Sequence, residues 1–178
     1  MFLELLEKRR SIRKYADRPV EPEKIEKLIE AALRSPSGRS INPWSFIVVD
    51  DHDRLERLSR AKPYGASFLK DAPLGIVVCA DLSKSDTCVE DASIASVFIH
   101  LEAASLGLGS CWIQIRKRMR DDGSTAEQYV CQELGIPEGF AVQSIIAIGY
   151  PGETKAGHAK GKLLFDKVHY NLFGSPRP

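Results

Sequence analysis

The longest predicted helix limits most strongly what this chain can fold into. It runs from about Asp91 to Leu106 and is stopped by Gly107, a residue that is common just after helix ends. Its apolar positions occupy much of the helix circumference: Ala92, Ala95, Phe98, Ile99 and Ala103. A helix with apolar residues on most sides is normally buried. We therefore expect this helix to be central in the fold and largely covered.

Four apolar runs are typical of buried strands. They cover residues 45–50, 74–80, 111–115 and 141–149. Pro73 opens the second run, and at the first position of a strand proline removes no hydrogen bond from the sheet. These runs predict four strands for the central helix to pack against.

Shorter helices are predicted between the strands. One or two turns precede residue 9, and a longer amphipathic helix starts at Pro22 and stops before Pro36. A third helix is expected to be capped by Asp53 and to end near residues 62–63. For the last helix, Ser124 and Glu127 have the spacing of a capping box, and Gly135 marks its end.

Length and charge exclude several classes of protein. The 178 residues suit one domain with a substantial core, and 25 basic against 24 acidic residues give a net charge of +1. Domains devoted to nucleic acid usually carry a broad basic excess, so no nucleic-acid partner is expected. No apolar run is long enough to cross a bilayer, and no signal-peptide core is evident. The four cysteines form no C-x-x-C pair, so we expect reduced thiols in a soluble, cytoplasmic protein.

Common catalytic and metal-binding motifs are missing from the sequence. The four histidines lack metal-ligand spacing, and there is no Gly-x-Ser-x-Gly elbow. Gly107 and Gly109 lack the third glycine of a dinucleotide fingerprint and follow a helix instead of a strand. A basic run at residues 116–120 is followed directly by two aspartates, which indicates a solvated loop.

Two polar clusters could share an anionic ligand. The first is the basic stretch 9–15 with Arg18, whose guanidinium groups match phosphate oxygens; taken alone it could equally be a solvated charge run. The second is the stretch 35–44, whose short polar side chains and glycine precede the first strand. Trp44 and Trp112 could pack a planar ring or simply belong to the core.

The chain beyond Gly149 changes character. A Gly- and Lys-rich segment leads to an apolar tail at residues 163–173. An apolar tail of this kind avoids water, so it either folds back or pairs with another subunit.

Several of these stretches resemble motifs of the nitroreductase family of flavoproteins. Residues 9–15 (Arg-Arg-Ser-Ile-Arg-Lys-Tyr) resemble the family's opening motif, and residues 35–46 resemble its Ala-Pro-Ser-Gly-x-Asn-x-Gln-Pro-Trp-x-Phe segment. Residues 103–113 and 148–151 match in order and spacing, and Lys162 with residues 164–170 resembles the closing tail. The resemblance extends over nearly the whole chain.

The resemblance implies an α+β fold, a three-layer sandwich in which helices flank a mixed central sheet. It also implies one domain, residues 1–178, working as an intertwined homodimer with two FMN molecules at the interface and residues 150–178 as an arm over the partner. By matched position, FMN would be held in one subunit by Arg9, Arg10, Ser11, Arg13 and Lys162, with Trp112, Ile113 and Gln114 along the flavin face. The other subunit would supply Pro36, Ser37, Gly38, Ser40 and Asn42. Neither a metal nor an acid–base residue is implied.

Two departures from the family pattern affect the second cluster. Ser40 stands where the family has Asn, and Asn42 stands where it has Gln, so both side chains are shorter. Contacts to the flavin ring could be lost or bridged by water.

The leading hypothesis is an FMN-dependent oxidoreductase that uses NAD(P)H to reduce small acceptors such as nitroaromatics or quinones by ping-pong hydride transfer. The alternatives are a flavin-dependent dehalogenase or flavin-fragmenting relative, a non-catalytic FMN-binding protein, and a weak nucleic-acid binder.

Overall fold

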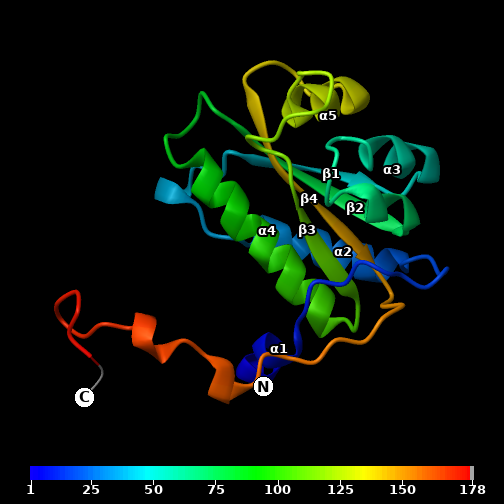
Figure 1. Cartoon of the computed structure of the whole chain (residues 1–178). Helices are drawn as coiled ribbons and strands as arrows, with labels where there is room; N and C mark the ends of the chain where they lie inside the picture. The colour runs from blue at the N-terminus through cyan, green and yellow to red at the C-terminus, as the bar shows by residue number, and fades with distance from the viewer. Residues whose placement is uncertain (177–178) are drawn as a thin grey trace.

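The computed structural model describes residues 1–176 and has a β-sheet between two layers of helices (Figure 1). The strands are β1 (Trp44–Val49), β2 (Leu74–Asp81), β3 (Gly109–Gln114) and β4 (Phe140–Gly149), in the order β1-β2-β4-β3. Neighbouring strands pair antiparallel throughout. The parallel component expected of a mixed sheet is confined, in the described residues, to a bridge between Ser11 and Ser110. All four strands lie where the sequence predicted them.

Helices cover both faces of the sheet, as the predicted three-layer sandwich requires. On one face, α2 (Pro22–Leu33) and α4 (Cys88–Ser105) pack on residues such as Ile76, Val78 and Ile146. On the other face, α3 (His52–Leu58) and α5 (Ala126–Leu134) pack on residues such as Val77, Val142 and Ile145. The two cores alternate along β2 because successive side chains of a strand point to opposite faces.

The long helix α4 starts earlier than predicted, at Cys88 instead of Asp91. Its inner side is buried as expected, and Ala95, Ile99 and Ala103 are inaccessible to solvent. Its outer side leaves Ile94 and Val97 exposed, at 38% and 47%. The helix is therefore covered by its own chain on one side only, and its apolar outer side is left open.

Two predicted helix caps lie at neighbouring residues. The N-cap of α3 is Asp51, which accepts from the Arg54 amide at 2.8 Å, and Asp53 lies in the first turn. The capping box of α5 is formed by Thr125 and Gln128. The predicted cap Ser124 is instead hydrogen-bonded to Asp122 in the preceding turn, so its side chain is not available to the helix.

Short connecting helices complete the chain: α1 (Phe2–Lys8) and the 3-10 turns η1 (Gly38–Ser40), η2 (Ser67–Asp71), η3 (Lys160–Lys162) and η4 (Phe165–Lys167). The segment after β4 runs beside the segment after α1. Backbone bonds join Ala16 to Tyr150, Gly152 to Lys14 and His158 to Glu7, at 2.8–2.9 Å. Beyond this point the arm leaves the body of the molecule (Figure 1).

The apolar tail does not fold back onto the sheet. Leu164, Leu172 and Phe173 remain 62%, 73% and 94% exposed. Of the two alternatives that the sequence leaves open, folding back onto the sheet is therefore not seen in this structure.

Candidate functional site

The first polar cluster lines a cavity of about 330 Å³ between α1, the end of α4 and the start of β3. Its cationic residues are Lys8, Arg9, Arg10 and Lys155, and Glu153 is its one acidic residue. Gly107, Leu108 and Gly109 form part of the wall, and no atom lies within 4 Å of the position that a Cβ on Gly107 would take. The predicted residues Arg9 and Arg10 are thus brought together in a basic hollow with one open wall.

Hydrogen bonds to the strand β3 and to the later segment fix the main chain of this cluster. Ile12 donates to the carbonyl of Ser110 at 3.0 Å, and Arg10 donates from its guanidinium to the carbonyl of Ala156. The Arg13 amide donates to Glu153 at 2.7 Å. The Arg13 guanidinium, however, lies over the Phe68 ring at 5.8 Å, so it points toward η2.

Lys155 is a member of the cluster that sequence reasoning missed. Its ammonium donates to the Ser11 carbonyl at 2.7 Å and lies 2.9 Å from Glu153. Lys155 lies in the Gly- and Lys-rich segment after Gly149, whose composition indicates a solvated segment. No local pattern distinguishes Lys155 from its neighbours. Only the pairing of two segments that are distant in sequence places it here.

A buried histidine lies behind the cluster. His100 Nδ1 is 2.7 Å from the Ser110 hydroxyl, and the ring stacks on Trp112 with centroids 6.4 Å apart. Burial, and secondarily the charge of Arg9, lowers the pKa of His100 to about 4. The imidazole is therefore neutral near pH 7 and supports Trp112 without adding charge to the site.

The three predicted flavin-face residues of β3 differ in orientation. Trp112 and Gln114 are half-buried on one side of the strand, and the indole N–H donates to the side-chain oxygen Oε1 of Gln114 at 2.9 Å. The side chain of Ile113 is fully buried in the opposite core. The Ser110 carbonyl accepts from the Ile12 amide, so it points away from β4, toward the outer edge of the sheet. Backbone groups alternate in direction along a strand, so the N–H and C=O groups of Trp112 and Gln114 point to this outer edge as well. Ile113 therefore offers no side chain to that side of β3.

The second polar cluster is a tight loop against the start of α4. Ser37 is its internal anchor: its hydroxyl accepts from the Asn42 amide at 2.9 Å and donates to the Asn42 side chain at 2.7 Å. Arg39, Ser40 and Asn42 have φ values of 52°, 55° and 53°. This left-handed region is costly for residues other than glycine, and such residues gather at ligand sites.

The structure keeps the two clusters apart. The second cluster contacts α4 at Asp91, in its first turns, whereas the cavity of the first cluster reaches Ala104 in its last turn. A rise of 1.5 Å per residue separates these positions by about 20 Å. One chain therefore does not close a single site from both clusters.

Lys162 does not line the basic cavity. It is in η3 on the exposed arm.

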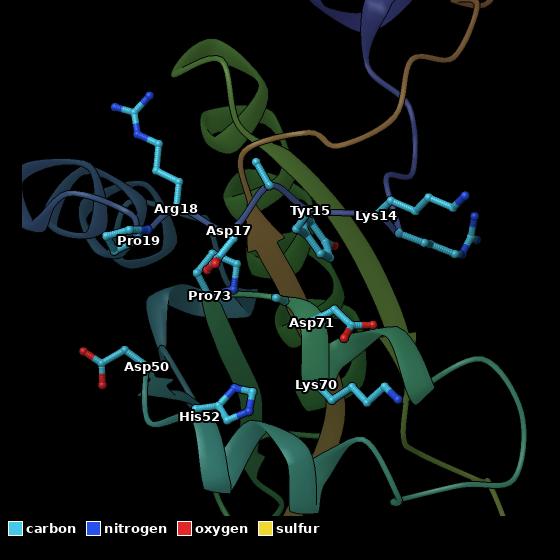
Figure 2. Close-up of a pocket in the computed structure, with 13 residues that line it drawn as sticks. Lys14, Tyr15, Asp17, Arg18, Pro19, Asp50, His52, Lys70, Asp71 and Pro73 are labelled. Atoms are coloured by element: carbon cyan, nitrogen blue, oxygen red, sulfur yellow. The ribbon is translucent and has the colours of Figure 1, made fainter.

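A larger hollow lies elsewhere, between residues 13–19 and the segments around Asp50 and η2 (Figure 2). It measures about 660 Å³ and is lined by side chains of both charges: Arg13, Lys14, Arg18, Lys70, Asp17, Asp50 and Asp71. The basic cavity beside β3 differs from it in having a single carboxylate, which is paired with Lys155.

Two kinds of feature are absent from residues 1–176. No helix there is both long and apolar enough to cross a membrane. No group of three or more histidine, cysteine or acidic side chains is arranged to hold a metal ion in the same residues.

Comparisons with known proteins agree with the geometry. The model of the nitroreductase family matches residues 6–63 and 54–150. A protein of Archaeoglobus fulgidus, provisionally named NADH dehydrogenase/NAD(P)H nitroreductase, is 40% identical over 172 residues, covering 94% of this chain and 95% of its own. The solved structure of an FMN-dependent nitroreductase from Clostridium difficile R20291 has a TM-score of 0.95 at 49% identity, covering 96% of this chain and 99% of that one.

A shorter match involves a different activity. Iodotyrosine deiodinase 1 of Rattus norvegicus is 47% identical over 57 residues, which cover 32% of this chain and 20% of the deiodinase. The family match extends over most of the chain, and the close relatives align over nearly their whole length. This chain belongs to the nitroreductase family.

Proposed function

We propose that this protein is an FMN-dependent oxidoreductase that takes electrons from NAD(P)H and passes them to small acceptors such as nitroaromatics or quinones. The two half-reactions alternate at one site, which is the ping-pong scheme. The cofactor and reductant follow from family membership and from the named activities of its close relatives. The acceptors, the ping-pong order and a cytoplasmic location go beyond these similarities and are part of the proposal.

The observation that carries the proposal is the basic cavity beside β3. Four cationic side chains surround it, and its one carboxylate, Glu153, is already engaged by Lys155 and the Arg13 amide. Arg9 forms no ion pair within residues 1–176, so its charge is free for a ligand. Guanidinium groups bind phosphate in paired hydrogen bonds, so the donor set fits the phosphate end of FMN.

We propose that the flavin site is shared between two copies of the chain. The separation of the clusters along α4 by about 20 Å leaves each copy with half a site. In a homodimer the first cluster of one copy would face the second cluster of the other, and residues 150–178, as an arm of a single domain, would lie over the partner. The open apolar side of α4 and the exposed apolar tail supply surface for that contact.

FMN supplies the chemistry of hydride acceptance and donation when it is bound. The residues of this chain bind and orient it. Arg9 and Arg10 hold the phosphate end, joined by Ser11 and by Lys162 if the arm turns toward the cavity. Trp112 and Gln114 present their side chains, and backbone groups at the edge of the sheet, along β3. Pro36, Ser37, Gly38, Ser40 and Asn42 contribute from the partner. Positive charge near the ring favours the anionic reduced form.

The visible spectrum of the purified protein tests this proposal. We expect a flavin band that bleaches under anaerobic NADPH or NADH and returns when a nitroaromatic or a quinone is added. Separate reduction and reoxidation phases in rapid mixing would establish the ping-pong order. A protein that takes up no FMN at micromolar concentration contradicts the proposal.

A dehalogenase is the second candidate, favoured by the local similarity to iodotyrosine deiodinase 1. Turnover of a halogenated phenol by the reduced protein, with release of halide, would support it over a general reductase. A non-catalytic FMN-binding protein would instead bind flavin without bleaching.

A further inference from the structure

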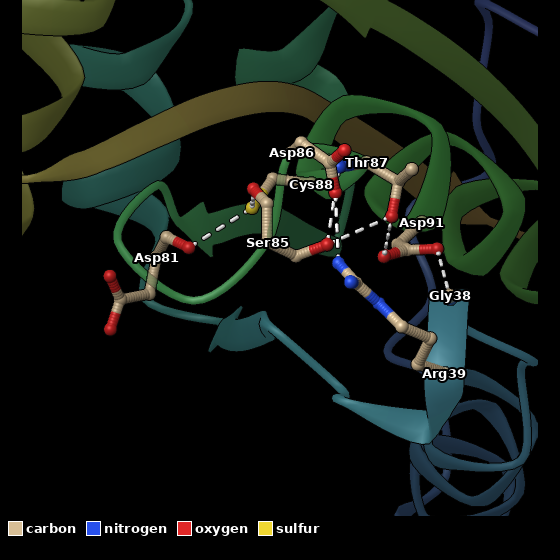
Figure 3. A network of polar contacts seen from close by, with 8 residues as sticks. All are labelled: Gly38, Arg39, Asp81, Ser85, Asp86, Thr87, Cys88 and Asp91. Atoms are coloured by element: carbon tan, nitrogen blue, oxygen red, sulfur yellow. Dashed lines mark hydrogen bonds and ion pairs between the residues drawn. The ribbon is translucent and has the colours of Figure 1, made fainter.

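A buried carboxylate anchors the loop of the second cluster. Asp91, in the first turns of α4, is only 3% exposed. One of its oxygens accepts from the Gly38 amide at 2.9 Å and the other from the Thr87 hydroxyl at 3.1 Å (Figure 3). No Lys, Arg or His in residues 1–176 forms an ion pair with it. Burying a carboxylate costs free energy unless its oxygens are hydrogen-bonded, as both oxygens of Asp91 are.

The surroundings of Asp91 allow the loop to approach α4 very closely. A Cβ on Gly38 would lie 2.6 Å from the Thr87 hydroxyl oxygen, so only glycine fits at this distance. The Thr87 hydroxyl is in turn 2.9 Å from the Ser85 hydroxyl. Gly38 is thus pressed against a prearranged set of hydroxyl and carboxylate groups.

The loop beyond this anchor has an unfavourable backbone. Three of the four residues that follow Gly38 are left-handed and are not glycine. Such conformations cost about 1–3 kcal/mol each and persist only where neighbouring interactions impose them. Asp91 supplies one of those interactions, and it is the buried one. The ion pair of Arg39 with Asp86, at 3.0 Å, joins side chains that are 72% and 82% exposed and holds the loop weakly.

We infer that Asp91 is a positioning residue for the flavin site, because its carboxylate fixes the loop 36–42 in the conformation that presents Ser37, Ser40 and Asn42 to the flavin of the partner subunit. The inference rests on the proposed function. Asp91 itself does not touch the cofactor in this scheme. It acts through the Gly38 amide.

The test compares Asp91→Ala, Asp91→Asn and the matched control Asp86→Ala in the full-length protein. Asn is the same size as Asp and keeps both bonds. Its side-chain oxygen accepts from the Gly38 amide, and its NH2 group donates to the Thr87 hydroxyl, which can turn to accept. We expect Asp91→Ala to raise the Kd for FMN about ten- to hundredfold, the worth of a hydrogen bond to a charged group. Asp91→Asn keeps both bonds as weaker, neutral ones, so its Kd should lie between those of wild type and Asp91→Ala, and Asp86→Ala should stay within about threefold of wild type.

Two readouts separate positioning from a general loss of stability. The visible circular dichroism of bound flavin should change in Asp91→Ala and be restored in Asp91→Asn. In flavin-free protein, hydrogen exchange at the Gly38 amide should be slow in wild type and in Asp91→Asn and fast in Asp91→Ala, while amides of β4 stay protected. If Asp91→Ala does not fold, Thr87→Val removes one of the two bonds and should weaken FMN binding in the same direction.

The outcomes distinguish the inference from the function it rests on. If wild type binds no FMN, the proposed function and this inference both fail. If wild type binds FMN and Asp91→Ala binds it equally tightly with an unchanged dichroism spectrum, only the inference fails. Equal losses in Asp91→Ala and Asp91→Asn also contradict it, because the hydrogen-bond geometry would then not be the cause.

Discussion

Arg9 carries a positive charge between the basic cavity and the buried His100. It caps α1 at its C-terminal end and lines the basic cavity, and its charge contributes to the low pKa of His100. We predict that Arg9→Gln weakens FMN binding about ten- to hundredfold, because a charge-assisted phosphate contact is lost. It should also raise the pKa of His100 from about 4, a shift that NMR of the imidazole can follow.

The matched control for Arg9 is Arg34→Gln on α2. Arg34 is exposed and pairs with Glu30 at 2.7 Å, away from the cavity. This change should leave both the FMN affinity and the histidine titration as in wild type. An equal loss of affinity in the two variants would mean that the phosphate site lies elsewhere.

Tyr15 is a stability determinant of the first cluster. Its hydroxyl donates to the Ile12 carbonyl at 2.8 Å and lies 3.2 Å from the Ala147 carbonyl. Burial raises the pKa of Tyr15 well above its ordinary value, so the phenol remains a donor at all working pH values. Tyr15→Phe should lower the free energy of unfolding by about 1–2 kcal/mol, because both carbonyls lose their hydroxyl partner. Urea unfolding measures this, and Tyr64→Phe, at an 88% exposed tyrosine, should have no effect.

At the residue scale, a local motif is what the sequence can indicate. Arg9 and Arg10 are adjacent in one motif and both line one cavity in the structure, and their contact with FMN stays a prediction. Lys155 and His100 were missed because only tertiary contacts, with Ser11 and with Ser110, bring them to the site. The strand that contains Ile113 is predicted correctly. Side chains alternate between the two faces of a strand, and this alternation buries Ile113 in the core instead of placing it at the site.

At the scale of elements, apolar periodicity predicts the positions of the strands and of the long helices. The exact start of a helix depends on which of several neighbouring polar side chains caps it. Asp53 and Ser124 are reasonable caps by sequence, yet Asp51 and Thr125 have the required backbone geometry. The left-handed conformation of Arg39, Ser40 and Asn42 could not be foreseen, because serine and arginine do not favour it. Its cause is the contact with Asp91, which lies about fifty residues away in sequence.

The junction of α2 with the end of β4 gives a pH-dependent prediction. Glu21 accepts from the Tyr150 hydroxyl at 2.7 Å, and this bond, with backbone and Arg18 contacts, lowers the pKa of Glu21 from 4.5 to about 2. Because the folded-state pKa is depressed, Glu21 contributes stability above about pH 4.5 and loses it as the pH falls toward 2. Glu21→Gln should lower Tm at neutral pH.

The Tm difference between wild type and Glu21→Gln should shrink as the pH falls through that window. Glu23→Gln, at an exposed residue in the first turn of the same helix, is the control and should show no such convergence. A Tm difference for Glu21→Gln that is constant from pH 7 to pH 2.5 would contradict the assignment.

At the scale of the whole molecule, the proposed homodimer gives a prediction for the C-terminal tail. Its tail exposes a row of apolar side chains: Leu163, Leu164, Phe165, Val168, Tyr170, Leu172 and Phe173. Deleting residues 163–178 should weaken the dimer at least about hundredfold, because several large apolar groups would lose their burial. Analytical ultracentrifugation measures the dimer, and FMN affinity should fall with it.

Deletion of residues 174–178 is the matched control for the tail, because it leaves every one of those apolar side chains in place. It should leave the dimer intact. A full-strength dimer after the longer deletion would show that the tail does not embrace the partner.

The distance between the two polar clusters has a consequence for mixtures of subunits. Consider one preparation carrying Arg9→Gln and another carrying Asn42→Ala, each with both of its sites damaged. If subunits exchange freely, half of the dimers contain one copy of each kind. In such a hybrid both lesions fall on the same flavin site, and the other site is assembled from two undamaged halves. Two nearly inactive proteins would then complement each other and recover about one quarter of the wild-type activity.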